Sequence, residues 1–326
     1  MLRRPNARGA QKTPSAEEQT ELHLEEVTWG GVTWVNIERP SRRETDHLAQ
    51  TYDFHPLALD DCLSRIQRPK IDEYEDYLFI VYHFPLYSKE VRVTRASQVS
   101  IFIGKTYLVT LHDGVLKPLV KLFRDCQLSE EARQSNLKSS GYLLYRITDM
   151  LVDYCLPITD KIMQNLERVE DEIFDLRPET LRELAILRRD IIANRRIIWS
   201  MKAVIGSLEY KTGRFTTEDM EVFWGDVVDH VDKIWDTLDE CKEIIEGLKD
   251  THDSISSHRT NEVMRVLTVI ATTMMPLTLV ASVYGMNVAL PGGVEGGGYT
   301  SFLTILGIMI AVIVIMLLFF RSRRWV

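Results

Sequence analysis

The sequence predicts an α+β domain built on a mixed sheet, followed by a long helical stalk and two transmembrane helices near the C-terminal end. Three observations lead to this fold class. Strand-like and short helical patterns alternate over residues 22–138, and helical patterns fill almost all of residues 139–262. Residues 266–320 contain a single charged side chain, Glu295. A wholly soluble chain, a disordered chain and a fibrous chain are thereby excluded.

The first domain is expected to span residues 22–138. Runs rich in β-branched and aromatic residues predict strands, and short amphipathic stretches predict helices. Gly30-Gly31 separates the first two strands and predicts a hairpin turn, and Pro56 suits the first position of the second helix. Strands are expected at 27–29, 32–37, 77–82, 91–93, 99–103 and 107–111, and helices at 44–53 and 56–64. Residues 1–21 are polar and are expected to form a disordered tail in the cytoplasm.

The stalk, residues 139–262, is expected to be helical. Residues 140–175 and 178–208 predict two helices, because Asp175 and Pro178 mark a break between them. A third helix of about 70 residues begins after Thr217 and rises about 105 Å at 1.5 Å per residue. A compact domain has no need of such a helix, whereas a stalk that leads into a membrane does.

The membrane domain, residues 263–326, is predicted to have two spans, each close to the 20 residues that cross a bilayer. The first covers about 264–285 and the second about 300–320, with an outer loop at 286–299. Arginines flank both spans on the same side, at positions 265, 321, 323 and 324, and Trp325 suits an interfacial anchor. The positive-inside rule therefore places both termini in the cytoplasm. The membrane is expected to be a plasma membrane of the bacterial inner membrane type.

The bulk charge narrows the classes of partner. The chain carries 47 acidic and 39 basic residues, a formal net charge of −8. This acidity argues against nucleic acid and is compatible with cations. The four cysteines are far apart, and neither they nor the histidines form a zinc motif. No nucleophile–base pattern or nucleotide-binding signature is recognised, so an enzyme is not expected.

A stripe of small and polar side chains follows one face of the long helix. Its positions repeat strictly every seven residues, which places them on one supercoiled face. They are Asp250, Ser254, Ser257, Asn261, Met264, Thr268, Ala271, Met275, Thr278 and Ser282. Such a stripe serves either helix packing or a water-filled path. Two spans are too few to enclose a path, so the path would require several copies around an axis. The continuation of the stripe to Asp250 favours the pore.

The first span ends in Tyr284-Gly285-Met286-Asn287, just before the short outer loop and the last span. This arrangement resembles the CorA family of divalent-cation channels, mainly for magnesium. Asn261-Glu262-Val263-Met264, Met275-Pro276-Leu277-Thr278, His55-Pro56-Leu57 and Gln67-Arg68-Pro69-Lys70 are also similar to the family. The resemblance implies a homopentamer with a funnel-shaped cytoplasmic part. It further implies Mg²⁺, with Co²⁺ and Ni²⁺ as further cargo, as both the transported and the regulatory ion.

The resemblance also assigns roles to residues. Gly285, Met286 and Asn287 match the selectivity filter, where a ring of Asn287 amides would hold hydrated Mg²⁺ without trapping it. Met264 and Leu267 match a hydrophobic gate, and Asn261, Met275 and Thr278 match further pore-facing positions. Asp61 and Asp226 match a regulatory site shared between subunits that senses cytoplasmic Mg²⁺, with Asp60 and Asp149 at a second site.

One departure from the family keeps alternatives open. The outer loop reads Leu290-Pro291-Gly292-Gly293-Val294-Glu295, whereas many relatives have an acid directly after the proline. Glu295 is therefore a weak candidate for collecting ions. The first alternative is a ZntB-like zinc transporter, and the second is a membrane-tethered scaffold or sensor that conducts nothing.

Overall fold

The computed structural model describes residues 22–64, 67–175, 177–286 and 299–323. The chain divides into two compact units, each described here by itself. The first contains Met1–Glu172 and Arg177–Glu246, and the second contains Ile173–Leu176 and Gly247–Val326. The expected tail at 1–21, Asn287, Glu295, Arg324 and Trp325 lie outside the described residues.

A mixed sheet forms the centre of the first unit, as predicted. It has six strands in the order β1-β2-β6-β5-β4-β3. Only β2 and β6 run parallel, and every other pairing is antiparallel. The strands are β1 (Leu24–Trp29), β2 (Val32–Glu38), β3 (Lys70–Glu73), β4 (Leu78–Ser88), β5 (Val93–Ile103) and β6 (Tyr107–His112). Gly30 and Gly31, with φ of 58° and 83°, form the predicted turn between β1 and β2, since both positions of that turn type require positive φ.

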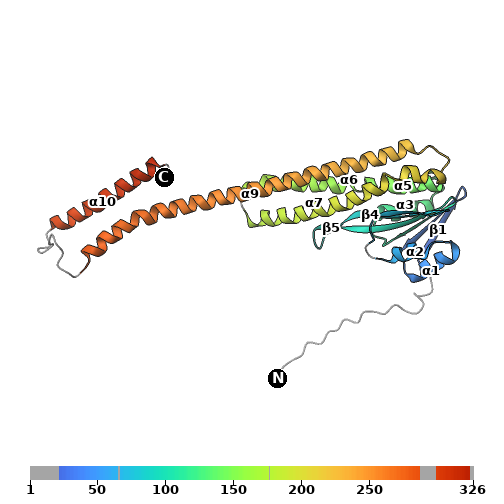
Figure 1. The fold of residues 1–326 in the computed structure, drawn as a ribbon, viewed down its shortest axis with the longest axis horizontal. Coiled ribbons are helices and arrows are strands. Elements are labelled where there is room, and N and C mark those ends of the chain that lie inside the picture. Colours follow the sequence, from blue (N-terminus) through green and yellow to red (C-terminus); the bar gives the residue numbers. More distant parts are fainter. Residues whose placement is uncertain (1–21, 65–66, 176, 287–298, 324–326) are drawn as a thin grey trace, which may run out of the picture. The chain divides into compact units, whose positions relative to one another are not determined.

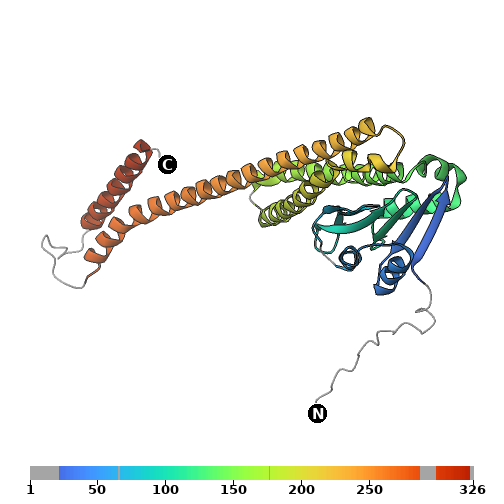
Figure 2. The ribbon, with the colours of Figure 1, turned by 45° about the vertical axis from the view of Figure 1, so that its right-hand side comes forward.

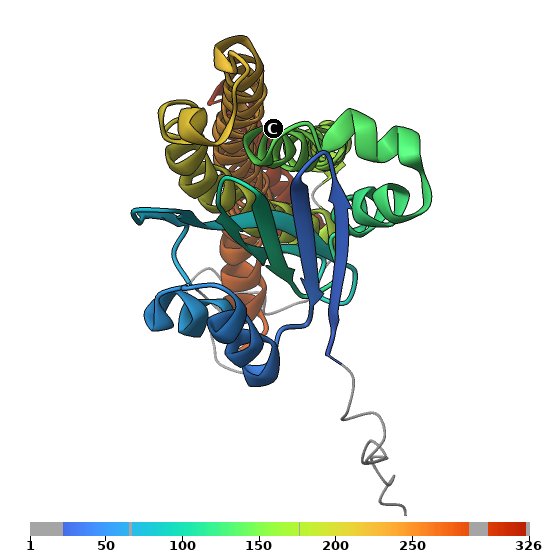
Figure 3. The same cartoon turned by 90° about the vertical axis from the view of Figure 1, so that its right-hand side faces the viewer.

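Helices cover both faces of the sheet (Figure 1). On one face, α1 (Arg42–Thr51) and α2 (Pro56–Leu63) close a core around Leu48, Phe54 and Phe102. On the other face lie α3 (Lys117–Leu128), α5 (Ser140–Asp153) and α7 (Pro178–Ile205), with α4 (Glu130–Asn136) beside α3 and α5. Figure 3 shows the two layers on opposite sides of the strands. Side chains of β4 alternate between the layers, since Phe79 belongs to the first core and the hydroxyl of Tyr82 reaches Thr148 on α5.

Two expected elements of the sheet need correction. The separate strands predicted at 91–93 and 99–103 are one strand of 11 residues, β5, paired along its length with an equally long β4. Thr94 and Ser97, which lie between the two predicted segments, are buried in β5, and these polar residues obscured the apolar pattern. The short strand β3 was not predicted, because its sequence Lys-Ile-Asp-Glu is mostly charged.

The helix predicted at 140–175 is also interrupted. It is divided into α5 and α6 (Leu156–Glu172), with a turn at Tyr154 and Cys155. Pro157 explains the break, because it has no N–H to bond the carbonyl of Asp153. The predicted break near Asp175 and Pro178 agrees with the structure, where the short 3₁₀ turn η1 (Ile173–Asp175) precedes α7. After α7 come α8 (Leu208–Thr212) and the 3₁₀ turn η2 (Gly213–Phe215).

The long helix α9 runs from Glu221 to Tyr284, 64 residues, and is slightly shorter than predicted. Within the first unit it buries one side against α6 and α7 (Figure 2). The buried positions alternate in steps of three and four, which is the seam of a coiled coil. They are Trp224, Val227, Val231, Ile234, Leu238, Cys241 and Ile245. Trp235 packs on Trp199 of α7, and the sulfur of Cys241 lies 4.0 Å from that of Met163 on α6.

The second unit contains the remainder of α9 and α10 (Tyr299–Ser322). Both helices have apolar stretches long enough to cross a membrane. Large apolar side chains such as Ile270, Leu279, Leu303 and Ile315 are more than half exposed. Exposed apolar surface of this extent is expected where lipid surrounds a helix. Both predicted spans are therefore candidate transmembrane helices by length and composition, and little of their apolar surface is buried within the chain.

Candidate ion pathway and metal site

The small and polar stripe lies on a free face of α9. All ten of its residues, from Asp250 to Ser282, are exposed within the chain. The covered face of the same stretch carries Val269, Thr273 and Leu277, which are 8–9% exposed. Thr273 and Met275 are two residues apart, about 200° around a helix that turns 100° per residue. The stripe therefore faces away from the surface that the chain itself covers.

Two threonine hydroxyls of the stripe donate hydrogen bonds to backbone carbonyls of α9 itself. Thr268 donates to the carbonyl of Met264 at 2.7 Å, and Thr278 donates to that of Met274 at 2.9 Å. Each hydroxyl oxygen keeps lone pairs that accept hydrogen bonds. Such an oxygen accepts from the water shell of a hydrated cation without leaving an unpaired polar group in the membrane.

The predicted gate and pore residues on and beside the stripe include both polar and apolar side chains. Met264, Met275, Asn261 and Thr278 lie on it, and Leu267 lies next to it. Met264, Leu267 and Met275 are 54%, 56% and 73% exposed. Apolar side chains that meet around an axis exclude water from a narrow path, which is how a hydrophobic gate closes.

The predicted filter sequence begins where α9 ends. The N–H of Gly285 bonds the carbonyl of Ala281 at 2.9 Å, and that of Met286 bonds Val283 at 3.3 Å. A Cβ at position 285 would lie 2.9 Å from the carbonyl oxygen of Ala281, so glycine is required for this close termination.

The seven-residue register of the stripe continues upstream into the first unit. Its positions there are exposed and mostly acidic. They are Val222, Asp226, Asp229, Lys233, Asp236, Glu240 and Glu243. This row gives the free face of α9 a negative potential that attracts cations.

A cluster of potential metal ligands joins α5 to α9. Ligand atoms of Asp149, Asp226 and His230 all lie within 4.8 Å of one another. His230 also places Nδ1 3.1 Å from a carboxylate oxygen of Asp153, and Arg146 places Nη1 3.0 Å from Oδ2 of Asp149. Burial raises the pKa of the Asp149 carboxyl, and the negative charges of Asp153 and Asp226 raise it further, against the effect of Arg146. A cation bound here would relieve that repulsion.

The donor set of this cluster fits a divalent cation. Two carboxylates suit Mg²⁺, which keeps several waters and accepts few protein ligands. An imidazole adds affinity for Co²⁺, Ni²⁺ and Zn²⁺, which bind nitrogen more readily than Mg²⁺ does.

The other two predicted regulatory acids are engaged differently within the chain. Asp61 accepts from Gln67 at 2.9 Å and pairs with Lys70 at 2.7 Å, while Asp60 pairs with Arg42 at 2.5 Å. Asp61 is thus neutralised by Lys70, whose pKa is raised by the bonds to Asp61 and Asp72 against the effect of burial. Within one chain the structure brings Asp149 to Asp226, and it brings neither Asp60 nor Asp61 to them.

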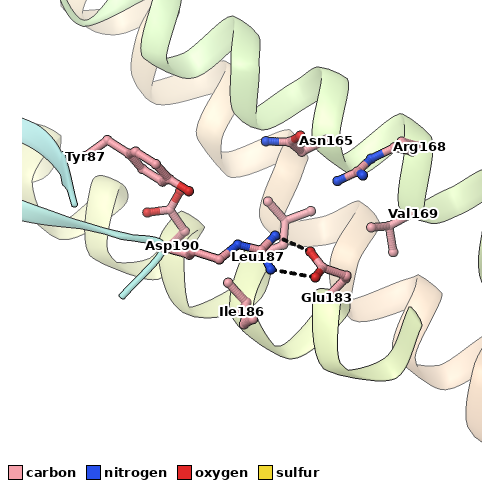
Figure 4. A pocket seen from close by; sticks show the side chains of 9 residues that line it. Tyr87, Asn165, Arg168, Val169, Glu183, Ile186, Leu187 and Asp190 are labelled. Atoms are coloured by element: carbon pink, nitrogen blue, oxygen red, sulfur yellow. Dashed lines mark hydrogen bonds and ion pairs between the residues drawn. The ribbon is translucent and has the colours of Figure 1, made fainter. Parts of the chain in front are cut away.

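A second polar cluster clamps the β4–β5 hairpin onto α7 (Figure 4). Arg92 donates both guanidinium nitrogens to Glu183, at 2.6 and 2.5 Å. Asp190, 6% exposed, accepts from the backbone N–H of Thr94 at 2.6 Å. These groups, with Tyr87, Asn165 and Arg168, line a cavity of about 30 Å³, large enough for a water molecule.

Comparison with known proteins places the chain in a family. A family model described as "CorA-like Mg2+ transporter protein" matches residues 29–324. The chain belongs to this family. The cobalt/magnesium transport protein CorA of Thermotoga maritima is 32% identical over 300 residues, covering 90% of this chain and 83% of its own. The putative metal ion transporter YfjQ of Bacillus subtilis is 31% identical over 309 residues, covering 90% and 89%.

The fold of this CorA-like chain is found in solved structures as well. The complete CorA magnesium transporter of Methanocaldococcus jannaschii superposes with a TM-score of 0.77 at 21% identity, covering 93% of this chain and 95% of the other. The α/β domain, the long helix and the two apolar helices therefore form a CorA fold, as the resemblance implied.

His230 and Asp153 of the CorA-like chain escaped the sequence analysis. Both lie four residues after a predicted ligand, since Asp149 precedes Asp153 and Asp226 precedes His230. Residues four apart share one face of a helix, so the two i, i+4 pairs were a usable signal. What was missing was the pairing of α5 with α9.

Proposed function

We propose that this chain is a divalent metal cation channel that carries Mg²⁺ into the cell, with Co²⁺ and Ni²⁺ as further cargo, under control of cytoplasmic Mg²⁺. The observation that carries the proposal is the exposed stripe of α9, which combines hydroxyl and amide groups with the apolar side chains of the predicted gate and leads toward the predicted filter sequence. Several copies around an axis, five by family resemblance, would turn these stripes inward and enclose a path.

The membrane potential supplies the driving force. An inside-negative potential is worth about 2.3 kcal/mol per charge per 100 mV, hence about 4.6 kcal/mol for a divalent ion. Asn287 amides at the outer mouth would bind the hydrated ion through its waters, and the hydroxyls of Thr278 and Thr268 would accept from the same waters further along. The acidic row of α9 would lower the energy of the ion at the cytoplasmic end.

Control by cytoplasmic Mg²⁺ would act through carboxylates at the subunit interfaces. Asp61 of one copy and Asp226 of the next would share an ion, with Asp149 and His230 adding ligands on the side of Asp226. An ion that binds only the closed arrangement stabilises that arrangement by mass action. Falling cytoplasmic Mg²⁺ would release the interfaces and allow the gate at Met264 and Leu267 to hydrate.

Ion uptake into proteoliposomes tests the proposal. Purified oligomers are reconstituted at low internal Mg²⁺ under an inside-negative potential, and uptake of Mg²⁺, Co²⁺ and Zn²⁺ is measured for the wild type and Asn287→Ala. We expect Mg²⁺ uptake that collapses in Asn287→Ala. Leu303→Ala, which alters an exposed apolar side chain of α10, serves as the matched control and should leave uptake unchanged.

Other outcomes would redirect the assignment. Zinc uptake that follows a pH gradient, without magnesium uptake, would assign the chain to zinc transport. No uptake of any ion by intact oligomers would favour a tethered scaffold. Magnesium uptake that persists unchanged when the potential is reversed would contradict a channel driven by the potential.

A further inference from the structure

A pocket of about 530 Å³ lies in the first unit, and it shares no lining residue with the stripe of α9 or with the Asp149 cluster. Its walls come from two segments and one strand. These are the link between α1 and α2 (Tyr52–Pro56), the turn between β3 and β4 (Tyr74–Tyr77), and Tyr107 at the start of β6. Its volume is in the range of sites for small molecules.

Aromatic rings form the floor of this pocket. Tyr74 stacks on Tyr77 with centroids 4.4 Å apart, and Tyr52 lies 4.7 Å from Tyr107. Phe54 joins the two pairs, 5.0 Å from both Tyr77 and Tyr52. Burial is the largest cause that raises the pKa of Tyr107 to about 12, and the neighbouring phenols of Tyr52 and Tyr77 and the carboxylate of Asp76 add to it. The phenols therefore stay neutral, and their ring faces offer the negative quadrupole that attracts cations.

Three acids form the rim of the pocket. Asp53, Glu75 and Asp76 line it and are exposed. Among the described residues, no ion pair or side-chain hydrogen bond of these three carboxylates is found, whereas neighbouring Glu73 lies 3.1 Å from Lys211. The rim thus carries negative charge that the described part of the chain leaves without an ion-pair partner.

Hydrogen bonds from Arg214 hold the turn that carries Glu75 and Asp76. Arg214 donates to the carbonyls of Tyr74 at 2.9 Å, Glu75 at 3.2 Å and Tyr77 at 3.2 Å. The hydroxyl of Tyr77 accepts from the N–H of His55 at 2.8 Å, which ties the turn to the α1–α2 link. Because Arg214 bonds backbone carbonyls, the carboxylates remain available, and the pocket needs little rearrangement to bind a ligand.

We propose that this pocket binds a small organic polycation, with alkylammonium groups on an aliphatic chain. Acids on both sides of an aromatic floor match a ligand with more than one amine and an apolar body between them. Mg²⁺ fits the pocket poorly, because it keeps its water shell and is not attracted to ring faces as an alkylammonium group is. The proposal stands whether or not the chain conducts ions.

Calorimetric titration of the full-length protein with spermidine, in excess Mg²⁺, tests this proposal. We expect saturable binding in the wild type. It should weaken at least tenfold in Asp53→Asn/Glu75→Gln/Asp76→Asn. Tyr74→Leu/Tyr107→Leu should weaken it about three- to tenfold, since the ring faces would be lost. The matched control, Glu167→Gln/Glu170→Gln/Asp171→Asn, neutralises three exposed acids on α6 and should bind like the wild type.

Three results would overturn the proposal. One is the absence of saturable binding in the wild type. Another is equal weakening by the pocket and control triple variants, because that would indicate general attraction to an acidic protein. The third is unchanged binding in the tyrosine variant with an unaltered circular dichroism spectrum, because an acidic rim alone would then account for the affinity.

Discussion

At the scale of the residue, the Asp149 cluster places an imidazole beside two carboxylates. His230 is about one-third exposed and Asp226 is more than half exposed, so water and hydrated ions reach the site. Arg146 already neutralises part of the charge of Asp149. An ion bound here would therefore compete with a guanidinium for Asp149, whereas the groups facing His230 are the carboxylates of Asp153 and Asp226. We therefore expect the imidazole to be the group that discriminates between metals.

We expect His230→Gln to weaken binding of Co²⁺ and Ni²⁺ about tenfold or more while leaving Mg²⁺ binding nearly unchanged. The lost nitrogen ligand matters only to the metals that prefer nitrogen. Competition titrations in detergent measure the affinities, with His258→Gln, an exposed histidine of α9, as the control. Equal weakening for Mg²⁺ and Co²⁺ would mean that His230 acts only through the local charge.

The raised pKa of Asp149 predicts a pH dependence. In the folded chain this carboxyl binds its proton more tightly than in the unfolded chain, because it is buried and lies near Asp153 and Asp226. Without divalent ions, stability should therefore fall as pH rises above the unfolded value near 3.8 and through the folded pKa. Asp149→Asn should remove that part of the fall, and urea unfolding in EDTA at several pH values measures it. A steeper fall in the variant would contradict the assignment.

At the scale of the element, the β4–β5 hairpin is held to α7 by two contacts that should contribute unequally to the free energy of unfolding. The Arg92–Glu183 pair is bidentate, but its side chains are 47% and 28% exposed, so water screens it. The bond from Thr94 N–H to Asp190 is buried, and losing a buried acceptor costs the desolvation of the N–H that it leaves unpaired. The bond to Asp190 should therefore contribute more to stability than the solvent-exposed Arg92–Glu183 ion pair.

We expect Asp190→Ala to destabilise the first unit by about 1–3 kcal/mol, the cost of an unpaired buried N–H. Glu183→Gln should cost about 1 kcal/mol or less. Asp190→Asn keeps an oxygen acceptor and should recover most of the loss. Urea unfolding followed by tryptophan fluorescence compares the three variants. A larger loss in Glu183→Gln than in Asp190→Ala would reverse the ranking.

The elements also differ in how well the sequence predicts them. The Gly30-Gly31 hairpin and the two membrane spans follow from local signals, a turn dipeptide and an uncharged length. The continuity of β5 does not, because Thr94 and Ser97, between the two predicted strands, read as a polar interruption although both are buried in the structure. The division of α5 from α6 was available from Pro157 and was overlooked.

At the scale of the whole molecule, sequence analysis predicted the order of domains and the family, and it could not predict which acids meet. Asp149 and Asp226 lie on helices far apart in the chain, and only the packing of α5 near α9 joins them. The ring of subunits that would join Asp61 to Asp226 stays a prediction, since it concerns contacts between copies.

The first unit has its own core, and we expect residues 22–246 to fold without the membrane helices. Purified alone, this fragment should be soluble, unfold in one cooperative transition and give a helical circular dichroism spectrum. The reason is that the sheet and the seam of α9 bury their apolar side chains within the unit. A fragment without a cooperative transition would show that the core depends on the second unit.

The parallel pairing of β2 with β6 has a consequence for biosynthesis. Thr33 pairs with Tyr107, so β2 cannot complete its hydrogen bonds until β3, β4 and β5 have been made. At 5–20 residues per second, that interval lasts on the order of 4–15 s. During it the nascent hairpin exposes an unpaired strand edge to the ribosome surface and to other nascent chains. When translation is slow or a chaperone is missing, misfolding or aggregation should therefore begin at the N-terminal hairpin, before any membrane helix is synthesised.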